Sequence, residues 1–240
     1  MSKLIAAITS SFLFLFANVS LAQPEGYNYD EDKVPKFELP DPLVLNSGKK
    51  VKNARVWTNK RRGQILELFK EHVYGRSPKP REDMHFEVTS VSEKALGGKA
   101  VRKEVTVYFS TDKNGPQMSI LLFLPVKAKA ATPTFLGVNF AGNHAIHPDS
   151  EITLSKNWMR PGDGIKDNRA TEASRGAKAS RWAVDMIIER GYGLATIYYG
   201  DIDPDIDDDF QNGVHPLFNK DGEKKPGPDG WGSIAAWAWG

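Results

Sequence analysis

The chain of 240 residues contains no cysteine. A thiol nucleophile and a cysteine-based metal site are therefore excluded, and its stability cannot depend on disulfides. An excess of charge of one sign is also missing, because 32 lysines and arginines are balanced by 30 aspartates and glutamates, for a formal net charge of +2. A nucleic-acid binder needs a basic stripe, so we expect no nucleic-acid partner.

Long apolar runs are missing too, with one exception at the start of the sequence. Lys3 precedes the apolar stretch Leu4–Val19, and Ser20-Leu21-Ala22 has the small-x-small pattern of a cleavage site. The stretch is shorter than the roughly 20 residues of a membrane span. The pattern predicts a signal peptide at 1–22, cleaved after Ala22, and a secreted or periplasmic protein that is free of the membrane afterwards.

The remaining sequence predicts an arm followed by one globular domain. Residues 23–48 are rich in proline and charged side chains, which favours an arm or linker, and we assign 23–57 to this N-terminal arm. Across the chain, 40% of residues are hydrophobic and 26% are charged, which is typical of globular domains. We assign 58–240 to the folded domain.

Hydrophobic periodicity predicts a helix and then several strands. Apolar residues recur at helical spacing over 59–73, with Asn59 as the expected N-cap. The period then changes to two, and Gly97-Gly98 predicts a hairpin turn. Alternation and short apolar runs predict strands at 86–91, 101–109, 118–124 and 134–140.

The pattern after residue 140 predicts a parallel crossover. The long polar stretch 141–178 has the length of a functional loop. A short helix, with Ser180 as its expected cap, and a strand at 193–199 follow it. Strand, helix and strand in succession place two strands in parallel. We therefore expect an α/β fold with a mixed sheet, and a ligand site where residues 141 and 200 leave the strands.

The last segment has the pattern of an unfinished helix. Asp229 is its expected N-cap, and Trp231–Gly240 holds three tryptophans with no C-terminal cap signal. Such a helix would leave a large apolar surface exposed, so we expect the natural protein to continue beyond Gly240.

Seven segments, in order, resemble the glucuronoyl esterases and the closely related acetyl-xylan-esterase-like proteins of bacteria. One of them is Gly137-Val-Asn-Phe-Ala-Gly-Asn-His144. The others are 65–69 with 73–75, 180–182, 190–196, 199–205, 213–214 and 231–240. The resemblance implies an α/β-hydrolase fold, which is a three-layer αβα sandwich with a mixed sheet. It also implies a Ser-acid-His triad that cleaves esters between glucuronic acid on xylan and lignin alcohols, without a cofactor.

The nucleophile of that family is missing from this sequence. It lies in a Gly-x-Ser-Arg-x-Gly-Lys motif on the strand after the Trp-rich helix, and no serine here stands in Gly-x-Ser-x-Gly. The nearest match, Gly75-Arg-Ser-Pro-Lys79, lacks the second glycine and follows a helix, whereas a nucleophile elbow follows a strand. We expect no catalytic residue in this chain. The serine, acid and histidine should follow Gly240, with the fold truncated before the nucleophile strand and the chain alone inactive.

The loop after the strand 134–140 is where the resemblance implies the oxyanion hole. In this fold a backbone N–H from that loop helps to bind the carbonyl oxygen as it becomes negative. Gly142, Asn143 and His144 are the candidates, and Gly142 would let the backbone approach the substrate. An ordinary turn after a strand is the alternative.

Other polar clusters are weaker candidates. His144 and His147 have a spacing that can ligate zinc, but a third ligand is not apparent, so we expect no metal. The acidic run 201–209 fails as a calcium loop, because Ile206 and Asn212 stand where glycine and glutamate are required. It is a solvated loop, or one or two of its acids structure the rim of the site. Three arginines could meet an acidic sugar or lie on the surface: Arg160, Arg169 and Arg175.

The sequence thus predicts a carboxylic ester hydrolase that acts on plant cell-wall polysaccharide, most specifically a glucuronoyl esterase with a serine mechanism. An acetyl xylan esterase on the same fold is the first alternative. A non-catalytic, carbohydrate-binding relative is the second. The expected partner is a polysaccharide or glucuronate ester, and the sequence makes no prediction of the oligomeric state.

Overall fold

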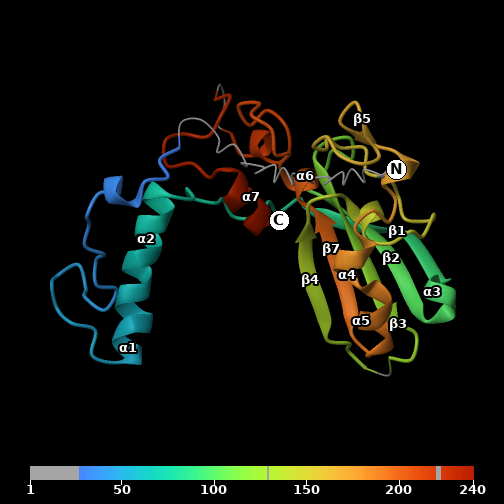
Figure 1. Ribbon diagram of the computed structural model, residues 1–240, viewed down its shortest axis with the longest axis horizontal. Coiled ribbons are helices and arrows are strands. Elements are labelled where there is room, and N and C mark those ends of the chain that lie inside the picture. The colour runs from blue at the N-terminus through green and yellow to red at the C-terminus, as the bar shows by residue number, and fades with distance from the viewer. Residues whose placement is uncertain (1–26, 129, 220–222) are drawn as a thin grey trace, which may run out of the picture. The chain divides into compact units, whose positions relative to one another are not determined.

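The structure, a computed structural model, describes residues 27–128, 130–219 and 223–240 (Figure 1). The predicted signal peptide at 1–22 lies outside the described residues. The chain divides into two units, Met1–Asp41 and Pro42–Gly240. The described part of the first unit holds a 3-10 helix, Glu31–Lys33, which Asp30 caps. Among the described residues, no helix combines the length and the apolarity needed to span a membrane.

The second unit contains a five-stranded mixed sheet in the order β1-β2-β3-β7-β4 (Figure 1). β1, β2 and β3 are antiparallel neighbours, and β3 is also antiparallel to β7. β4 pairs with β7 in parallel, as the crossover pattern predicted. The strands are β1 His85–Lys94, β2 Ala100–Tyr108, β3 Gln117–Pro125, β4 Thr134–Asn139 and β7 Gly193–Tyr198.

The β1–β2 hairpin turns where the glycine pair predicted it. The turn is the short helix α3, Ala95–Gly98, in which Leu96, Gly97 and Gly98 all have positive φ. Glycine adopts this left-handed region without steric cost, so the glycine pair can form the tight turn that connects the two strands. A smaller ribbon pairs β5, Ile165–Lys166, with β6, Arg169–Ala170.

The first predicted helix is present but begins earlier than expected. α1, Ala54–Val56, runs through a π-helical turn, Trp57–Arg61, into α2, Arg62–His72. The expectation of Asn59 as N-cap is wrong. Asn53 caps the helix instead, because its extended backbone lets Oδ1 accept from the N–H of Val56 at 3.0 Å.

One face of the sheet is covered by the crossover helices. α4, Ala179–Trp182, and α5, Val184–Glu189, are separated at Ala183, whose φ is +35°. Ser180 therefore lies inside α4 rather than capping a single helix, and that expectation is wrong. The cluster on this face joins α5 to β3 and β7 through Val184, Ile188, Leu121, Phe123 and Leu194.

Elements from the end of the chain pack against the opposite face of the sheet, near the end of β7. α6, Tyr199–Ile202, and α7, Ser233–Trp239, pack over residues of β3 and β7 that include Met118 and Ile197. Leu194 faces α5 and Ile197 faces α7, and residues three apart on a strand point to opposite faces. The sheet is therefore the middle of three layers, which confirms the predicted αβα sandwich.

The start of α7 differs from the prediction. Gly232 precedes the helix and makes no side-chain cap, so the expectation of Asp229 as N-cap is wrong. Asp229 lies too early for that role, and its carboxylate accepts from the Nε of Arg76 at 3.1 Å. Arg76 also donates to the carboxylate of Glu67 on α2. Arg76 therefore links α2 to the segment that leads into α7.

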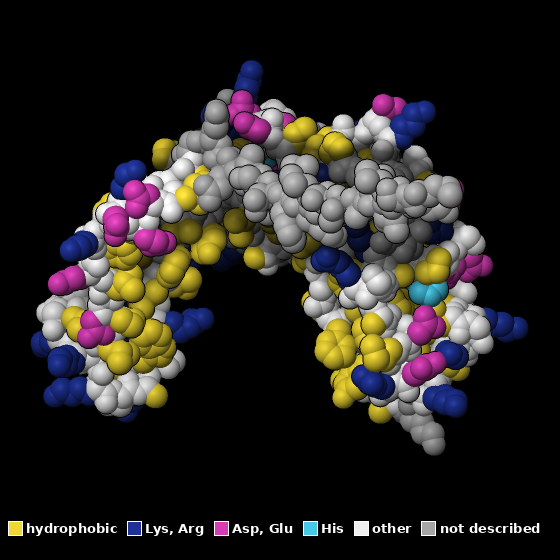
Figure 2. All heavy atoms as spheres, viewed as in Figure 1, with side chains coloured by type: hydrophobic (Ala, Val, Ile, Leu, Met, Phe, Trp, Pro, Cys, Tyr) yellow, Lys and Arg dark blue, Asp and Glu magenta, His cyan; other side chains and the backbone are white. Residues whose placement is uncertain are grey.

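β4 exposes hydrophobic side chains on both of its faces. In the described residues it pairs with β7 on one side and with no strand on the other. Hydrophobic side chains are visible over β4 in Figure 2. Four of them at or next to this strand are exposed: Phe135, Leu136, Val138 and Phe140. An unpaired apolar edge of this kind promotes association with another strand.

Two buried charged residues of β2, Arg102 and Glu104, hold the long segment 141–178 against the sheet. Arg102 on β2 is 1% exposed, and its guanidinium donates to Asp149 at 2.6 Å and to Glu151 at 3.1 Å. Beside it, buried Glu104 accepts from both the N–H and the hydroxyl of Thr153, each at 2.9 Å. These contacts hold the segment against β2, so its route is set by the sheet.

Removing the Asp149 carboxylate is expected to destabilise the fold, because the Arg102 guanidinium stays buried when its nearest carboxylate is lost. We expect Asp149→Ala to lower the free energy of unfolding by about 3 kcal/mol. Glu151→Ala is the matched control: its carboxylate side chain is 64% exposed, and we expect a loss of about 1 kcal/mol or less. Chemical denaturation measures both, and equal losses would contradict the assigned role of Asp149.

Candidate functional site

The segments that follow β4 and β7 meet at one edge of the sheet. In the parallel ladder Asn139 is opposite Tyr198, so both strands end together. The loop from Ala141 leads into a 3-10 helix, Asn143–Ala145, while α6 follows β7 directly. The prediction that these two segments share an edge is confirmed, and this edge is the candidate site.

Gly142 turns the chain at this edge in a way that requires glycine. Its φ is +87°, and an added Cβ would lie 2.5 Å from the Cε1 of His144 and 2.6 Å from the Cε of Met159. The carbonyl of Gly142 accepts from Ala145 at 3.0 Å. Among the described residues, the N–H groups of Gly142 and Asn143 have no hydrogen-bond acceptor. The turn therefore presents two unused donors.

Buried amide side chains hold this turn in place. Oδ1 of Asn139 accepts from the N–H of Ala141 at 3.2 Å, and its Nδ2 donates to Oδ1 of Asn143 at 2.8 Å and to the Thr196 hydroxyl at 3.0 Å. Nδ2 of Asn143 donates to the carbonyl of Ser119 at 2.7 Å. Both polar atoms of the Asn143 side chain are thus engaged, and its free donor is the backbone N–H. We call this set of bonds the amide network.

The amide network continues through Ser119 to Asp201 on α6. The N–H of Ser119 donates to Oδ2 of Asp201 at 3.0 Å, and Nδ2 of Asn157 donates to Oδ1 at 2.7 Å. Burial raises the pKa of the Asp201 carboxyl to about 6, while these two donors oppose the rise. Asp201 is therefore a buried residue of α6, bonded to β3 and to the long segment, and does not belong to a solvated loop.

His144 forms a buried pair with Ser174, 2.9 Å from its Nε2. The hydroxyl of Ser174 donates its single proton to the carbonyl of Thr171 at 2.7 Å, so Nε2 must be the donor to Ser174. A histidine acting as general base would have to accept that proton instead. The pair is therefore a structural link that joins the Gly142 turn to the segment 171–174.

Burial lowers the pKa of His144 to about 4, with the positive charge of Arg175 as the second cause. The unfolded chain binds this proton near pH 6.5 and the folded chain only near pH 4, so acid favours unfolding between these values. We expect the stability of the parent relative to His144→Gln to fall by about 3 kcal/mol as the pH drops from 6.5 to 4. Denaturation curves across this range measure it, and a constant difference would contradict the assignment.

The two histidines of the zinc hypothesis face different partners. Nε2 of His147 lies 3.6 Å from Asp185, and its Nδ1 accepts from the N–H of Asp149 at 3.1 Å. His144 is committed to Ser174. Among the described residues, no three histidine, cysteine, aspartate or glutamate side chains come close enough to hold a metal ion. The spacing of the pair therefore reflects two separate structural roles.

The three candidate arginines each have different hydrogen-bond and ion-pair partners. Arg175 donates to the carbonyls of Asp149 and Ile152 at 3.0 and 2.7 Å, which makes it a brace for the long segment. Arg160 pairs with Asp205. Arg169 is exposed, and its guanidinium donates only to the neighbouring carbonyl of Asn168 in the described structure.

The mixed sheet with helices on both faces, its parallel crossover and the turn after β4 define an α/β-hydrolase fold. No protein-family model matches the chain. Its similarity is to carbohydrate esterases: over 221 residues it is 46% identical to carbohydrate esterase MZ0003 of an unknown prokaryotic organism, across 91% of this chain and 51% of that protein. The resemblance to the glucuronoyl esterases that the short motifs indicated is confirmed.

Solved structures agree with this relationship. A glucuronoyl esterase from Solibacter usitatus matches with a TM-score of 0.79 and 45% identity, over 87% of this chain and 53% of that chain. A promiscuous CE15 esterase from a marine bacterial metagenome matches with a TM-score of 0.75 and 46% identity, over 89% and 53%. The chain thus spans about half the length of the relatives it matches.

The sequence offered Gly142, Asn143 and His144 as candidates for the oxyanion loop, but the residues that hold this turn were not predicted. Asn139 and Ser119 lie within predicted strands, where the pattern gave no functional signal. The one available signal was an asparagine at the end of an apolar strand, since a buried amide needs partners. Asp201 was grouped with its acidic neighbours, although the hypothesis that one or two acids structure the rim included it.

Proposed function

We propose that the full-length gene product is a secreted or periplasmic serine esterase that cleaves glucuronoyl esters of plant cell-wall polysaccharide. The observation that carries this proposal is the 45% identity to a glucuronoyl esterase over 87% of the chain. The leader cleaved after Ala22 would deliver the enzyme to a substrate outside the cytoplasm. The catalytic serine, acid and histidine would lie in the half of the relatives' length that this chain does not span.

The turn after β4 would supply the oxyanion hole. Attack of a serine on an ester makes the carbonyl oxygen negative, and donors already aimed at that oxygen stabilise the transition state. The N–H groups of Gly142 and Asn143, which have no acceptor in the described structure, would be such donors. His144 would contribute by holding the turn through Ser174, because its own imidazole is buried.

The exposed edge of β4 would receive the rest of the sheet. Phe135, Leu136 and Val138 lie on an unpaired strand, and a further strand with its helices would bury them. A nucleophile on that next strand would stand at the same sheet edge as the Gly142 turn. The arrangement would bring serine and oxyanion donors to one carbonyl.

The test is hydrolysis of a benzyl ester of glucuronic acid by the full-length gene product, and the release of the free acid is what is measured. We expect hydrolysis together with labelling of one serine by an organophosphonate. The 240-residue chain is the matched control and should be inactive. Hydrolysis of acetylated xylan alone would favour the acetyl xylan esterase, and sugar binding without any hydrolysis would favour the non-catalytic relative. Either result would contradict the proposal.

A further inference from the structure

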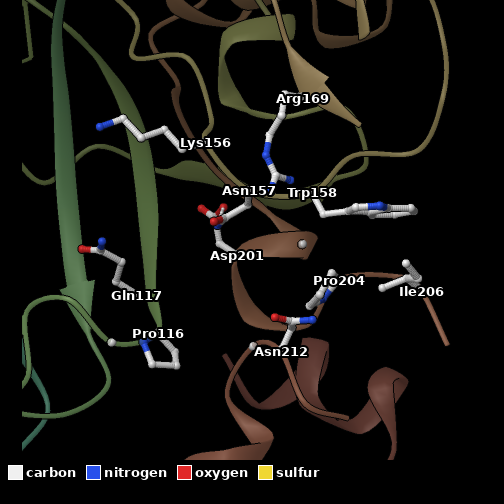
Figure 3. A pocket seen from close by; sticks show the side chains of 13 residues that line it. Pro116, Gln117, Lys156, Asn157, Trp158, Arg169, Asp201, Pro204, Ile206 and Asn212 are labelled. Carbon is white, nitrogen blue, oxygen red and sulfur yellow. Dashed lines mark hydrogen bonds between the residues drawn. The ribbon is translucent and has the colours of Figure 1, made fainter. Parts of the chain in front are cut away.

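A cavity of about 290 Å³ opens beside Asp201, next to the amide network (Figure 3). Its lining comes from three parts of the chain: the start of β3, the long segment after β4, and the segment from α6 onward. Ligand pockets in proteins run from about 300 Å³ upward, so a group as small as a single sugar ring fits this volume. Seven residues with polar or aromatic side chains line it: Gln117, Lys156, Asn157, Trp158, Arg169, Asp201 and Asn212.

The carboxylate of Asp201 is held in place before any ligand arrives. Asp201 is 8% exposed, and each of its carboxylate oxygens accepts one hydrogen bond, from Ser119 and Asn157. Each oxygen keeps a lone pair, so the carboxylate can accept further donors. A buried carboxylate at a cavity wall, held in one orientation, is suited to accept from neighbouring hydroxyl groups.

The remaining lining is also matched to a polyhydroxylated ring. The amide of Gln117 can donate and accept, as sugar hydroxyls do, and that of Asn212, which already donates to Asp208, keeps one N–H and its oxygen. Trp158 supplies a flat apolar surface whose negative face attracts the C–H groups of a pyranose. In the described structure no carboxylate lies within ion-pair distance of Arg169, so its guanidinium is available to ring oxygens.

Other small ligands fit this lining less well. A metal ion would need several carboxylates or histidines, and Asp201 is the single acidic side chain among the lining residues. A phosphate would be attracted by Arg169 and Lys156, but it would lie against the Asp201 carboxylate, which repels it when charged. A neutral, hydroxyl-rich ligand uses all these groups without that conflict.

We propose that the Asp201 cavity is a sugar-binding subsite for a pyranose residue of the polysaccharide, separate from the centre that cleaves the ester. The proposal rests on the proposed function, because the identity of the polymer follows from it. The subsite is tied to the oxyanion turn by a single residue: the N–H of Ser119 binds Asp201 and its carbonyl binds Asn143. A polymer seated in the cavity would therefore be positioned relative to the donors that act on its ester.

The test uses the full-length gene product with xylotriose, a neutral sugar that carries no ester. Isothermal titration calorimetry measures the Kd of the parent and of two variants, Trp158→Ala and Asn212→Ala. We expect xylotriose to bind and both variants to weaken its binding by about tenfold, the effect of losing one stacking or hydrogen-bonding partner. Asp207→Ala is the matched control: Asp207 is exposed on the same loop as Asn212, lies outside the cavity, and its loss should leave the Kd unchanged.

Absence of binding by the parent, or equal Kd values in parent and variants, would overturn the subsite. Asn212 is exposed, so its variant should fold even if Trp158→Ala does not. The ester assay on the parent separates the two proposals. Hydrolysis with unweakened sugar binding in the variants would overturn the subsite alone. Weakened binding in the variants without hydrolysis by the parent would overturn the esterase function and leave the subsite standing.

Discussion

Replacing Gly142 with alanine is expected to lower the kcat/KM of the full-length gene product for a glucuronate ester by about 100-fold. The change adds one methyl group at a residue whose φ is +87°, where that methyl would lie 2.5 Å from His144 and 2.6 Å from Met159. Neither neighbour is free to move, because both are buried. The turn must therefore shift, and its two free N–H groups shift with it. Loss of one well-placed oxyanion donor costs about 3 kcal/mol in the transition state, which corresponds to this fold-change.

The matched control for this variant is Gly162→Ala. Gly162 lies in the same long segment, but its φ is not positive and an added Cβ would meet nothing within 4 Å. Its substitution should leave kcat/KM within about twofold of the parent, as is usual for surface changes. A Gly142→Ala variant with full activity would show that the turn after β4 is not the oxyanion hole, whatever its stability.

Asn139→Asp is expected to lower the free energy of unfolding by about 4 kcal/mol at pH 7, although it exchanges one NH₂ group for one oxygen. In the parent, Nδ2 donates to three oxygens: those of Asn143, Thr196 and the carbonyl of Ile197, at 2.8 to 3.0 Å. In the variant a carboxylate oxygen would face these acceptors in a site where Asn139 is 2% exposed. An uncompensated buried charge carries a penalty of this size.

The pH dependence distinguishes this cause from a general packing defect. Protonation would give the new carboxyl one donor again. The loss in free energy of unfolding relative to the parent should therefore become smaller as the pH is lowered. Urea denaturation at several pH values measures it. Asn114→Asp is the control, because Asn114 is exposed in a turn and its change should cost less than about 0.5 kcal/mol. A deficit that is small, or that does not vary with pH, would contradict the role given to Asn139.

The sheet could be predicted because its strands carry local signals. The alternation over 101–109 and the apolar runs at 118–124 and 134–140 correspond closely to β2, β3 and β4. The hydrophobic pattern within each segment predicts a strand, and the glycine pair predicts the hairpin turn. The parallel crossover then followed from the order of the elements.

The helix caps could not be predicted as reliably, because the sequence offers several capping residues near each helix start. Asn53 and Asn59 both precede the apolar face of α2, and only the backbone conformation decides between them. Ser180 and Asp229 failed for another reason: α4 and α7 begin after Lys178 and Gly232, and neither helix has a side-chain cap. Capping depends on φ and ψ at one residue, whereas periodicity averages over a whole element.

The interior of the candidate site could not be predicted either, because its bonds join residues far apart in the sequence. Asn139 reaches Thr196 across 57 positions, and His144 reaches Ser174 across 30. Asp201 is buried while Asp207 and Asp209, in the same acidic run, are exposed. The family resemblance predicted a functional role for the turn after β4, and the hydrogen bonds that hold this turn are visible only in the structure.

Ser119 has a consequence for how this protein can vary over evolution. It joins Asp201 to Asn143 through its N–H and carbonyl alone, so the link would survive a change to almost any other residue. Proline is the exception, since it has no N–H to donate. Inserting or deleting one residue in β3 would instead shift the strand by one position and break both bonds at once. Natural variation should therefore be wide in the side chain at this position and nearly absent in the length of the strand around it.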